Sequence, residues 1–185
     1  MIDLSLLILQ KELNNYLKTS VVLDNIAFID STDNSERLRD NVIITLVNTE
    51  EESTMKNGLY YHRNAIGGID YENPPIFLNI YIVLAVNFPT NYGTVALKHL
   101  SNIVKFFQGK NTFYFSDEEG NEAQMTLDLY TMTFEQINHL WGSLGGKQIP
   151  FVMYKVRLLR LTDHRRLATG SIIIEIEGSV SPNNM

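Results

Sequence analysis

The chain has 185 residues, 44% of them hydrophobic, so it is long enough for one domain with a sizeable core. Its 21 acidic and 15 basic residues give a formal net charge of −6, which argues against nucleic acid as the main partner. It has no cysteine, which excludes disulfides, thiolate catalysis and zinc–thiolate sites.

The N-terminus does not have the pattern of a secretory signal, because no basic segment precedes its apolar run and Asp3 interrupts that run. The longest uncharged stretch is 73–97, and its apolar part, 76–86, is too short to cross a bilayer. We therefore expect a soluble protein that leaves a cell only within an assembly or by lysis.

The first predicted element is a helix over residues 2–18. Apolar residues recur there at helical spacing and predict one buried face, made of Leu6, Leu9, Leu13, Tyr16 and Leu17. A short β-prone run, 21–29, follows it. Residues 30–40 are rich in Ser, Thr, Asn and Asp and are predicted to form a loop. Residues 42–47 are apolar on both faces, which is typical of a central strand.

Residues 49–75 are predicted to be a long connection. The segment begins with three glutamates at 50–52 and contains several Gly and Pro turn signals, with Tyr60, Tyr61 and Tyr71 between them. A connection of this length in a compact domain is either functional or disordered. Tyrosines are unusual in a purely solvated loop, so we interpret it as an adaptable contact surface, with a mobile loop as the alternative.

Residues 76–88 alternate strictly and predict the longest and most central strand, with one face made of Ile76, Leu78, Ile80, Ile82, Leu84, Val86 and Phe88. Residues 90–108 predict a second long helix, capped by Thr90 or Asn91. Its buried ridge is predicted to be Ala96, Leu100, Ile103 and Phe107, widened by Leu97 and Val104. Residues 112–115 and 123–130 then predict a hairpin.

Residues 132–161 predict a capped helix, a glycine stop and a long strand. Thr133 and Gln136 are spaced as a capping box, flanked by a hydrophobic staple of Met132 and Ile137. The apolar helix face is predicted to be Phe134, Ile137, Leu140, Trp141 and Leu144. For Trp141 we favour a core position against the sheet, with an interface anchor as the alternative. Gly145-Gly146 ends the helix.

The strand that begins at residue 151 has a period of two, so Val152, Tyr154, Val156 and Leu158 face one way and Lys155 and Arg157 the other. Residues 163–170 are predicted to be a basic turn, and 172–176 a last strand with Glu175 outward. The sum is an α+β fold, in which about three helices pack on a largely antiparallel mixed sheet. We expect a single domain over residues 1–178 and a flexible tail over 179–185.

No local pattern indicates catalysis. The four histidines are far apart and lack helical metal-ligand spacing, and the glycine pairs lack the rest of a phosphate loop. No G-x-S-x-G elbow is present. The acidic runs 50–52 and 117–119 are interpreted as solvated loops, with a carboxylate pair assembled in space, as in a glycoside hydrolase, as a minor alternative. We expect neither an enzyme nor a cofactor.

Two blocks carry a family resemblance. The first has Trp141 and Leu144 on a helix, a glycine turn, Pro150, and a strand with Tyr154 and Val156. The second is Y-I-V-L-A-V-N-F at 81–88, followed by Tyr92, Ala96-Leu97, Leu100-Ser101 and Phe106-Phe107-Gln108. Together they cover roughly half of the chain and resemble the N-terminal domain of tail-terminator (cap) proteins of extracellular contractile injection systems. Those are phage-tail-like particles such as the antifeeding prophage and the Photorhabdus virulence cassettes.

The resemblance implies a structural protein, a six-fold ring that ends a contractile sheath and its inner tube. It implies partnership with copies of itself and with sheath and tube proteins, with neither nucleic acid nor direct membrane insertion. It places the protein in the bacterial cytoplasm during assembly and then in an extracellular or cell-anchored particle. Candidate contact residues are Tyr60, Tyr61, Arg63, Tyr71, Lys155, Arg157 and Glu175. The alternative is a small module that binds a peptide or carbohydrate through residues 55–71.

Overall fold

The computed structural model describes residues 1–31, 35–52, 60–63, 68–72, 75–116, 120, 122–161 and 166–170. A six-stranded sheet has the order β1-β2-β5-β8-β7-β6: Val21–Leu23, Asn41–Glu51, Ile76–Asn87, Phe151–Leu161, Glu122–Tyr130 and Thr112–Ser116. The β1–β2 pairing is parallel and the other described pairings in this sheet are antiparallel. The predicted α+β fold with a largely antiparallel mixed sheet is therefore confirmed.

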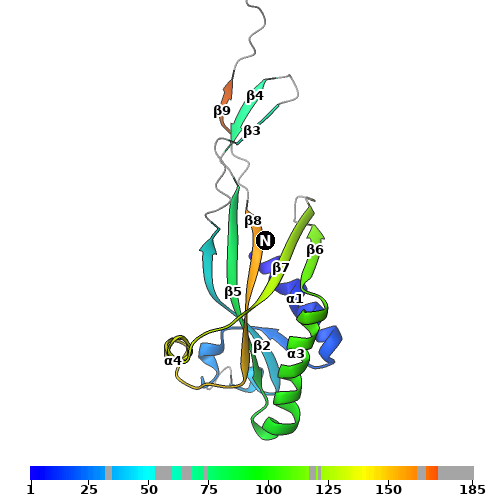
Figure 1. Ribbon diagram of the computed structural model, residues 1–185, viewed down its shortest axis with the longest axis vertical. Coiled ribbons are helices and arrows are strands. Elements are labelled where there is room, and N and C mark those ends of the chain that lie inside the picture. The colour runs from blue at the N-terminus through cyan, green and yellow to red at the C-terminus, as the bar shows by residue number, and fades with distance from the viewer. Residues whose placement is uncertain are drawn as a thin grey trace, which may run out of the picture.

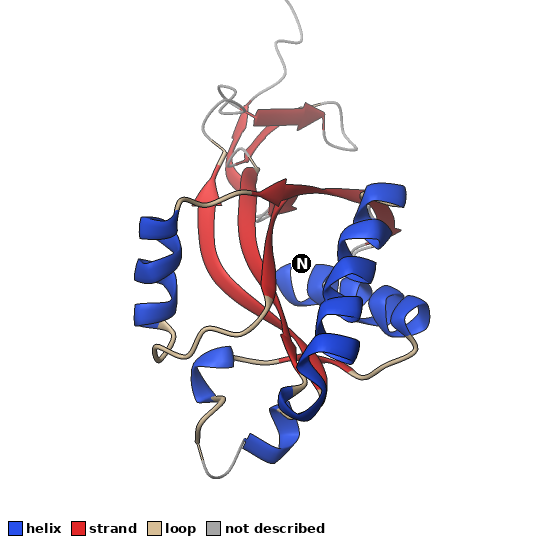
Figure 2. Ribbon diagram, turned by 60° about the horizontal axis from the view of Figure 1, so that its bottom comes forward, coloured by secondary structure: helices blue, strands red, loops and turns tan. Residues whose placement is uncertain are grey.

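One face of the large sheet is covered by two long helices, α1 (Ile2–Leu17) and α3 (Leu97–Gly109), as Figure 2 shows. The predicted stripe of β5 lies on this face from Leu78 onward, where Ile80, Ile82, Leu84 and Val86 are at most 1% exposed, whereas Ile76 is 49% exposed. Leu9 and Leu13 of α1 and Ile103 of α3 are fully buried against them. The alternating side chains of β5 thus pack against both helices, and the predicted central strand is confirmed.

The opposite face is covered by shorter elements: a 3-10 turn, η1 (Ile26–Phe28), and the helices α2 (Ser35–Leu38) and α4 (Phe134–Ser143). Trp141 is 4% exposed and packs edge-on against Phe151 with ring centroids 5.2 Å apart. The predicted core position of Trp141 is confirmed. The capping box is present, since Gln136 N–H donates to Thr133 Oγ1 and Thr133 N–H donates to Gln136 Oε1.

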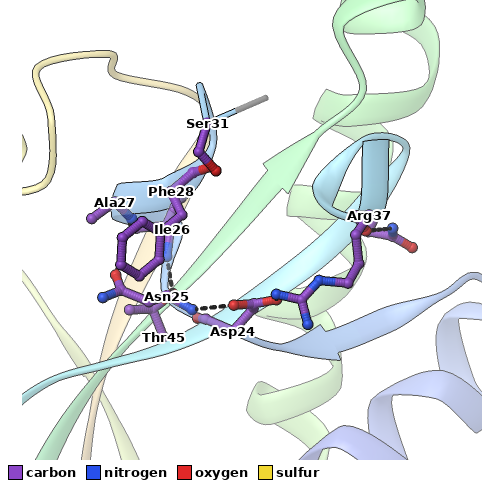
Figure 3. A network of polar contacts seen from close by, with 9 residues as sticks. Asp24, Asn25, Ile26, Ala27, Phe28, Ser31, Arg37 and Thr45 are labelled. Carbon is purple, nitrogen blue, oxygen red and sulfur yellow. Dashed lines mark hydrogen bonds and ion pairs between the residues drawn. The ribbon is translucent and has the colours of Figure 1, made fainter. Parts of the chain in front are cut away.

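A polar network fixes η1 on this face (Figure 3). The Thr45 hydroxyl of β2 donates to the Asp24 carbonyl at 2.6 Å and accepts from Ile26 N–H at 3.1 Å. The Asp24 carboxylate lies 2.6 Å from the Arg37 guanidinium of α2. Gly145 has φ +100°, and a Cβ at this position would lie 3.6 Å from the Ala27 carbonyl oxygen, so the turn after α4 packs on η1. These contacts join η1, α2 and the turn after α4 into one layer on this face of the sheet.

A second sheet has the order β3-β4-β9: Tyr60–Arg63, Ile69–Glu72 and Arg166–Gly170. It projects beyond one end of β5 and β8, away from the four helices (Figure 1). We call it the small sheet. Its strands are antiparallel throughout their described registers.

Several sequence predictions were wrong in detail. The predicted loop 30–40 contains α2, whose Leu38 is fully buried, and the acidic residues at 50 and 51 extend β2. The predicted connection 49–75 contains β3 and β4, and the predicted turn 163–170 contains β9. Thr90 and Asn91 do not cap α3, because a 3-10 turn (Pro89–Asn91) and a π-helical turn (Tyr92–Ala96) precede it. Three residues predicted on buried helix faces are exposed instead: Phe134 of α4 (88%), Tyr16 of α1 (48%) and Leu97 of α3 (41%).

Candidate interaction surfaces

The small sheet presents two of the tyrosines that the sequence singled out. Tyr61 of β3 lies directly opposite Tyr71 of β4, and their ring centroids are 6.5 Å apart. Tyr61 is 63% exposed, and Ile69, two residues before Tyr71 and on the same face, is 37% exposed. This face therefore offers aromatic and aliphatic surface to solvent. Tyr60 and Arg63 are also on β3, whereas Glu175 and the predicted strand 172–176 lie outside the described residues.

The basic residues of the second predicted surface, on β8, already contact side chains of the neighbouring strands. Arg157 Nε lies 2.6 Å from Asp128 Oδ2 of β7, and Lys155 Nζ lies 5.6 Å from the centre of the Tyr81 ring on β5. Both basic side chains face outward as predicted, on the sheet face away from α1 and α3. They belong to a different sheet from Tyr61 and Tyr71, so the seven predicted residues do not form one site.

We call Tyr81, Asp128, Lys155 and Arg157 the polar row. Tyr81 connects this row to β2. Its hydroxyl donates to Glu50 Oε2 at 2.7 Å, and its ring meets that of Tyr130 edge-on at 5.1 Å. The hydrogen bond to Glu50, with partial burial, raises the pKa of Tyr81 to about 12. The Tyr81 hydroxyl is therefore a hydrogen-bond donor at neutral pH, not a base. The row is suited to contact by shape and hydrogen bonding more than by net positive charge.

An open groove of about 330 Å³ lies near the C-terminal end of β5. Its lining comes from four segments: Ile29, Asp30, Glu36, Arg39, Asn87, Pro89, Lys147 and Ile149. Lys147 Nζ pairs with Asp30 Oδ1 at 2.7 Å, and Arg39 Nη2 donates to Thr90 Oγ1 at 3.2 Å. The charges balance within the groove. Sequence reasoning missed it because no two of these segments are linked by a local motif.

Within the described part of the chain, no three His, Asp or Glu side chains gather as metal ligands. No helix among these residues has the length and apolar character needed to cross a bilayer.

A protein-family model described as the Pvc16 N-terminal domain matches residues 7–174. The chain belongs to the Pvc16 N-terminal domain family. No protein with curated annotation matches it.

Two solved structures share the fold of this Pvc16 N-terminal domain. One is the sheath/tube terminator, in its extended state, of PVC, an extracellular contractile injection system; it has a TM-score of 0.67 and 10% identity. The other is the tube-terminating cap of the anti-feeding prophage, AFP, with a TM-score of 0.64 and 12% identity. The similarity covers 95% and 97% of this chain and 61% of each of those chains. The chain therefore spans about three fifths of the length of these relatives, and the resemblance noted in the sequence is confirmed.

Proposed function

We propose that this protein is a structural terminator, or cap, of a contractile injection system, and that it acts without catalysis. The observation that carries the proposal is the shared fold, over nearly the whole chain, with a sheath/tube terminator and a tube-terminating cap. A terminator acts through shape, because it matches the last ring of a polymer and presents a different surface outward. The partners proposed here are copies of the chain itself, expected as a six-membered ring, and sheath and inner-tube proteins.

The candidate contact residues keep separate roles in this proposal. Tyr60, Tyr61, Arg63 and Tyr71 belong to the small sheet, which projects from the covered body and is well placed to reach a neighbouring protein. Lys155 and Arg157 belong to the polar row of the large sheet, where a partner replaces or extends their present contacts with Tyr81 and Asp128. Glu175 is retained as a contact residue from its predicted outward position. The domain is proposed to span residues 1–178, followed by a flexible tail, 179–185.

The test is assembly of the purified chain. Light scattering coupled to size exclusion, with electron microscopy of the eluted species, is expected to show a closed ring. When sheath or tube polymers are added, electron microscopy is expected to show this ring bound to their ends. The protein is expected in the bacterial cytoplasm before assembly and in the released or cell-anchored particle afterwards. A monomer at every concentration, with no affinity for tube or sheath subunits, would contradict the proposal.

A second candidate function rests on the exposed Tyr61–Tyr71 pair. Neighbouring tyrosine rings with open faces are also suited to stacking on a carbohydrate or gripping a peptide. A glycan and peptide array tests this. Two results together would favour the binding module over the terminator: the chain does not assemble, and it binds an array ligand saturably in a way that Tyr61→Ala abolishes.

A further inference from the structure

Two exposed apolar features lie on opposite faces of the large sheet. Phe134, the first residue of α4, is 88% exposed, the highest value among the described large hydrophobic residues. On the other face, Leu129 of β7 is 55% exposed and Leu97 of α3 is 41% exposed. Figure 2 shows α4 on one side of the sheet and α1 and α3 on the other. A ring requires two different patches on each subunit, and these two differ in both position and shape.

The receiving patch begins with one flank of α3. Phe106 marks the flank that faces α1, since its ring centroid lies 4.9 Å from that of Tyr16. Leu97 and Val104 are seven residues apart and lie together on the other flank, where Val104 is half-buried.

The end of β7 completes this patch. Leu129 lies directly opposite Tyr154 of β8, so both side chains are on the helix-covered face. The Tyr154 ring packs on Phe107 of α3 with centroids 4.7 Å apart, so Leu129 lies opposite a residue that contacts α3. We call Leu97, Val104 and Leu129 the α3–β7 seam.

The charges beside the two patches are complementary. Glu135 follows Phe134 and is exposed, while Lys98 and Lys105 are exposed on the solvent side of α3. None of the three has an ion-pair partner among the described residues. The helix dipole accounts for an acidic residue in the first turn of α4. It does not account for a phenylalanine held in water beside it.

We propose that Phe134 of one copy docks in the α3–β7 seam of the next copy, with Glu135 facing Lys98 and Lys105. The contact is heterologous, so each subunit gives its Phe134 to one neighbour and its seam to the other. This inference rests on the proposed ring and names the surfaces that close it.

Two variants separate the halves of the contact. Phe134→Ala removes the inserted ring, and Leu129→Arg puts a charge into the seam. Each variant is expected to self-associate at least about tenfold more weakly than the unmodified chain, as loss of an aromatic anchor does. An equimolar mixture is expected to form a two-subunit complex and no larger species, because one intact Phe134 and one intact seam remain. Light scattering after size exclusion measures both results.

Phe28→Ala is the matched control, since Phe28 is a half-exposed aromatic of η1 outside both patches, and it should assemble like the unmodified chain. Thermal melting checks that all three variants fold.

The absence of native cysteine allows a direct cross-link. A Phe134→Cys chain mixed with a Leu129→Cys chain is expected to give an oxidised dimer on a non-reducing gel, and neither chain alone should match its yield. Variants that assemble like the unmodified chain, with no cross-link, would overturn this contact and leave the ring intact. An unmodified chain that remains monomeric throughout would overturn the ring and this contact with it.

Discussion

The large sheet and the small sheet differ in how much of their apolar surface is buried. The large sheet has a buried apolar cluster on each face, one under α1 and α3 and the other under η1, α2 and α4, and its central strand β5 is buried from residue 82 to residue 86. The small sheet has short strands and leaves Tyr61 and Ile69 in solvent. A three-stranded sheet needs a hydrophobic face that it buries, or a helix packed on it, to be stable by itself. We interpret the large sheet as the source of stability and the small sheet as a surface kept for contact.

The largest effect should come from the covered part of the large sheet. Trp141→Ala is expected to lower the free energy of unfolding by about 3–5 kcal/mol, because it removes a buried indole and leaves a cavity against Phe151. Urea unfolding followed by circular dichroism measures this, and assembly should be lost only through unfolding. An unchanged unfolding midpoint with assembly abolished would instead make Trp141 an interface residue.

The next effect concerns the network that holds η1 on the sheet. Thr45→Val keeps the side-chain shape but leaves the Ile26 N–H and the Asp24 carbonyl without their partner, so it should cost about 1–3 kcal/mol. Ser31→Ala is the control, because the Ser31 hydroxyl donates to the Phe28 carbonyl at the surface of the same network. Equal destabilisation by the two substitutions would show that burial of the Thr45 hydrogen bonds does not determine the loss in the free energy of unfolding.

Local signals were enough to predict most of the covered sheet. The alternation of residues 76–88 and the Thr133–Gln136 capping box each specify structure within a few residues, and both are present. The helix α2 was missed because a single turn has no period; it is held by burial of Leu38 and by the ion pair of Arg37 with Asp24. Phe134 was misplaced because its spacing of seven residues from Trp141 predicts a shared face, whereas the first turn of α4 leaves it exposed.

The candidate surfaces were less predictable for a different reason. The outward direction of Lys155 and Arg157 follows from strand alternation, but their partners Tyr81 and Asp128 come from strands far away in sequence. The pairing of Tyr61 with Tyr71 depends on a register that no local residue pattern sets. Contacts made across a sheet require the topology, and the topology became clear only in the structure.

A smaller effect is expected from pH. Burial, with a contribution from Lys98, holds the pKa of His99 below its usual value, and the ring stacks on Phe88 with centroids 5.2 Å apart. The unfolded chain therefore binds a proton at His99 at a higher pH than the folded chain does. The contribution of neutral His99 to the free energy of unfolding is fully present above about pH 6.5, and it is lost as the pH falls through the lower pKa of the folded state. Urea midpoints at pH 7.5 and pH 5 measure the fall. His99→Gln should reduce it, while His139→Gln, at an exposed position of α4, should not.

The smallest effect on stability, and the sharpest contrast with Trp141, is expected at the small sheet. Tyr61→Ala should change the free energy of unfolding by no more than about 0.5 kcal/mol, because its ring is largely in solvent. If the small sheet is a contact surface, the same substitution should weaken binding to the end of a sheath or tube polymer, measured by co-sedimentation. Tyr114→Ala, at a 77% exposed position on β6 of the large sheet, is the matched control. A loss of stability close to that of Trp141→Ala would mean that the two sheets unfold together and share one stabilising role.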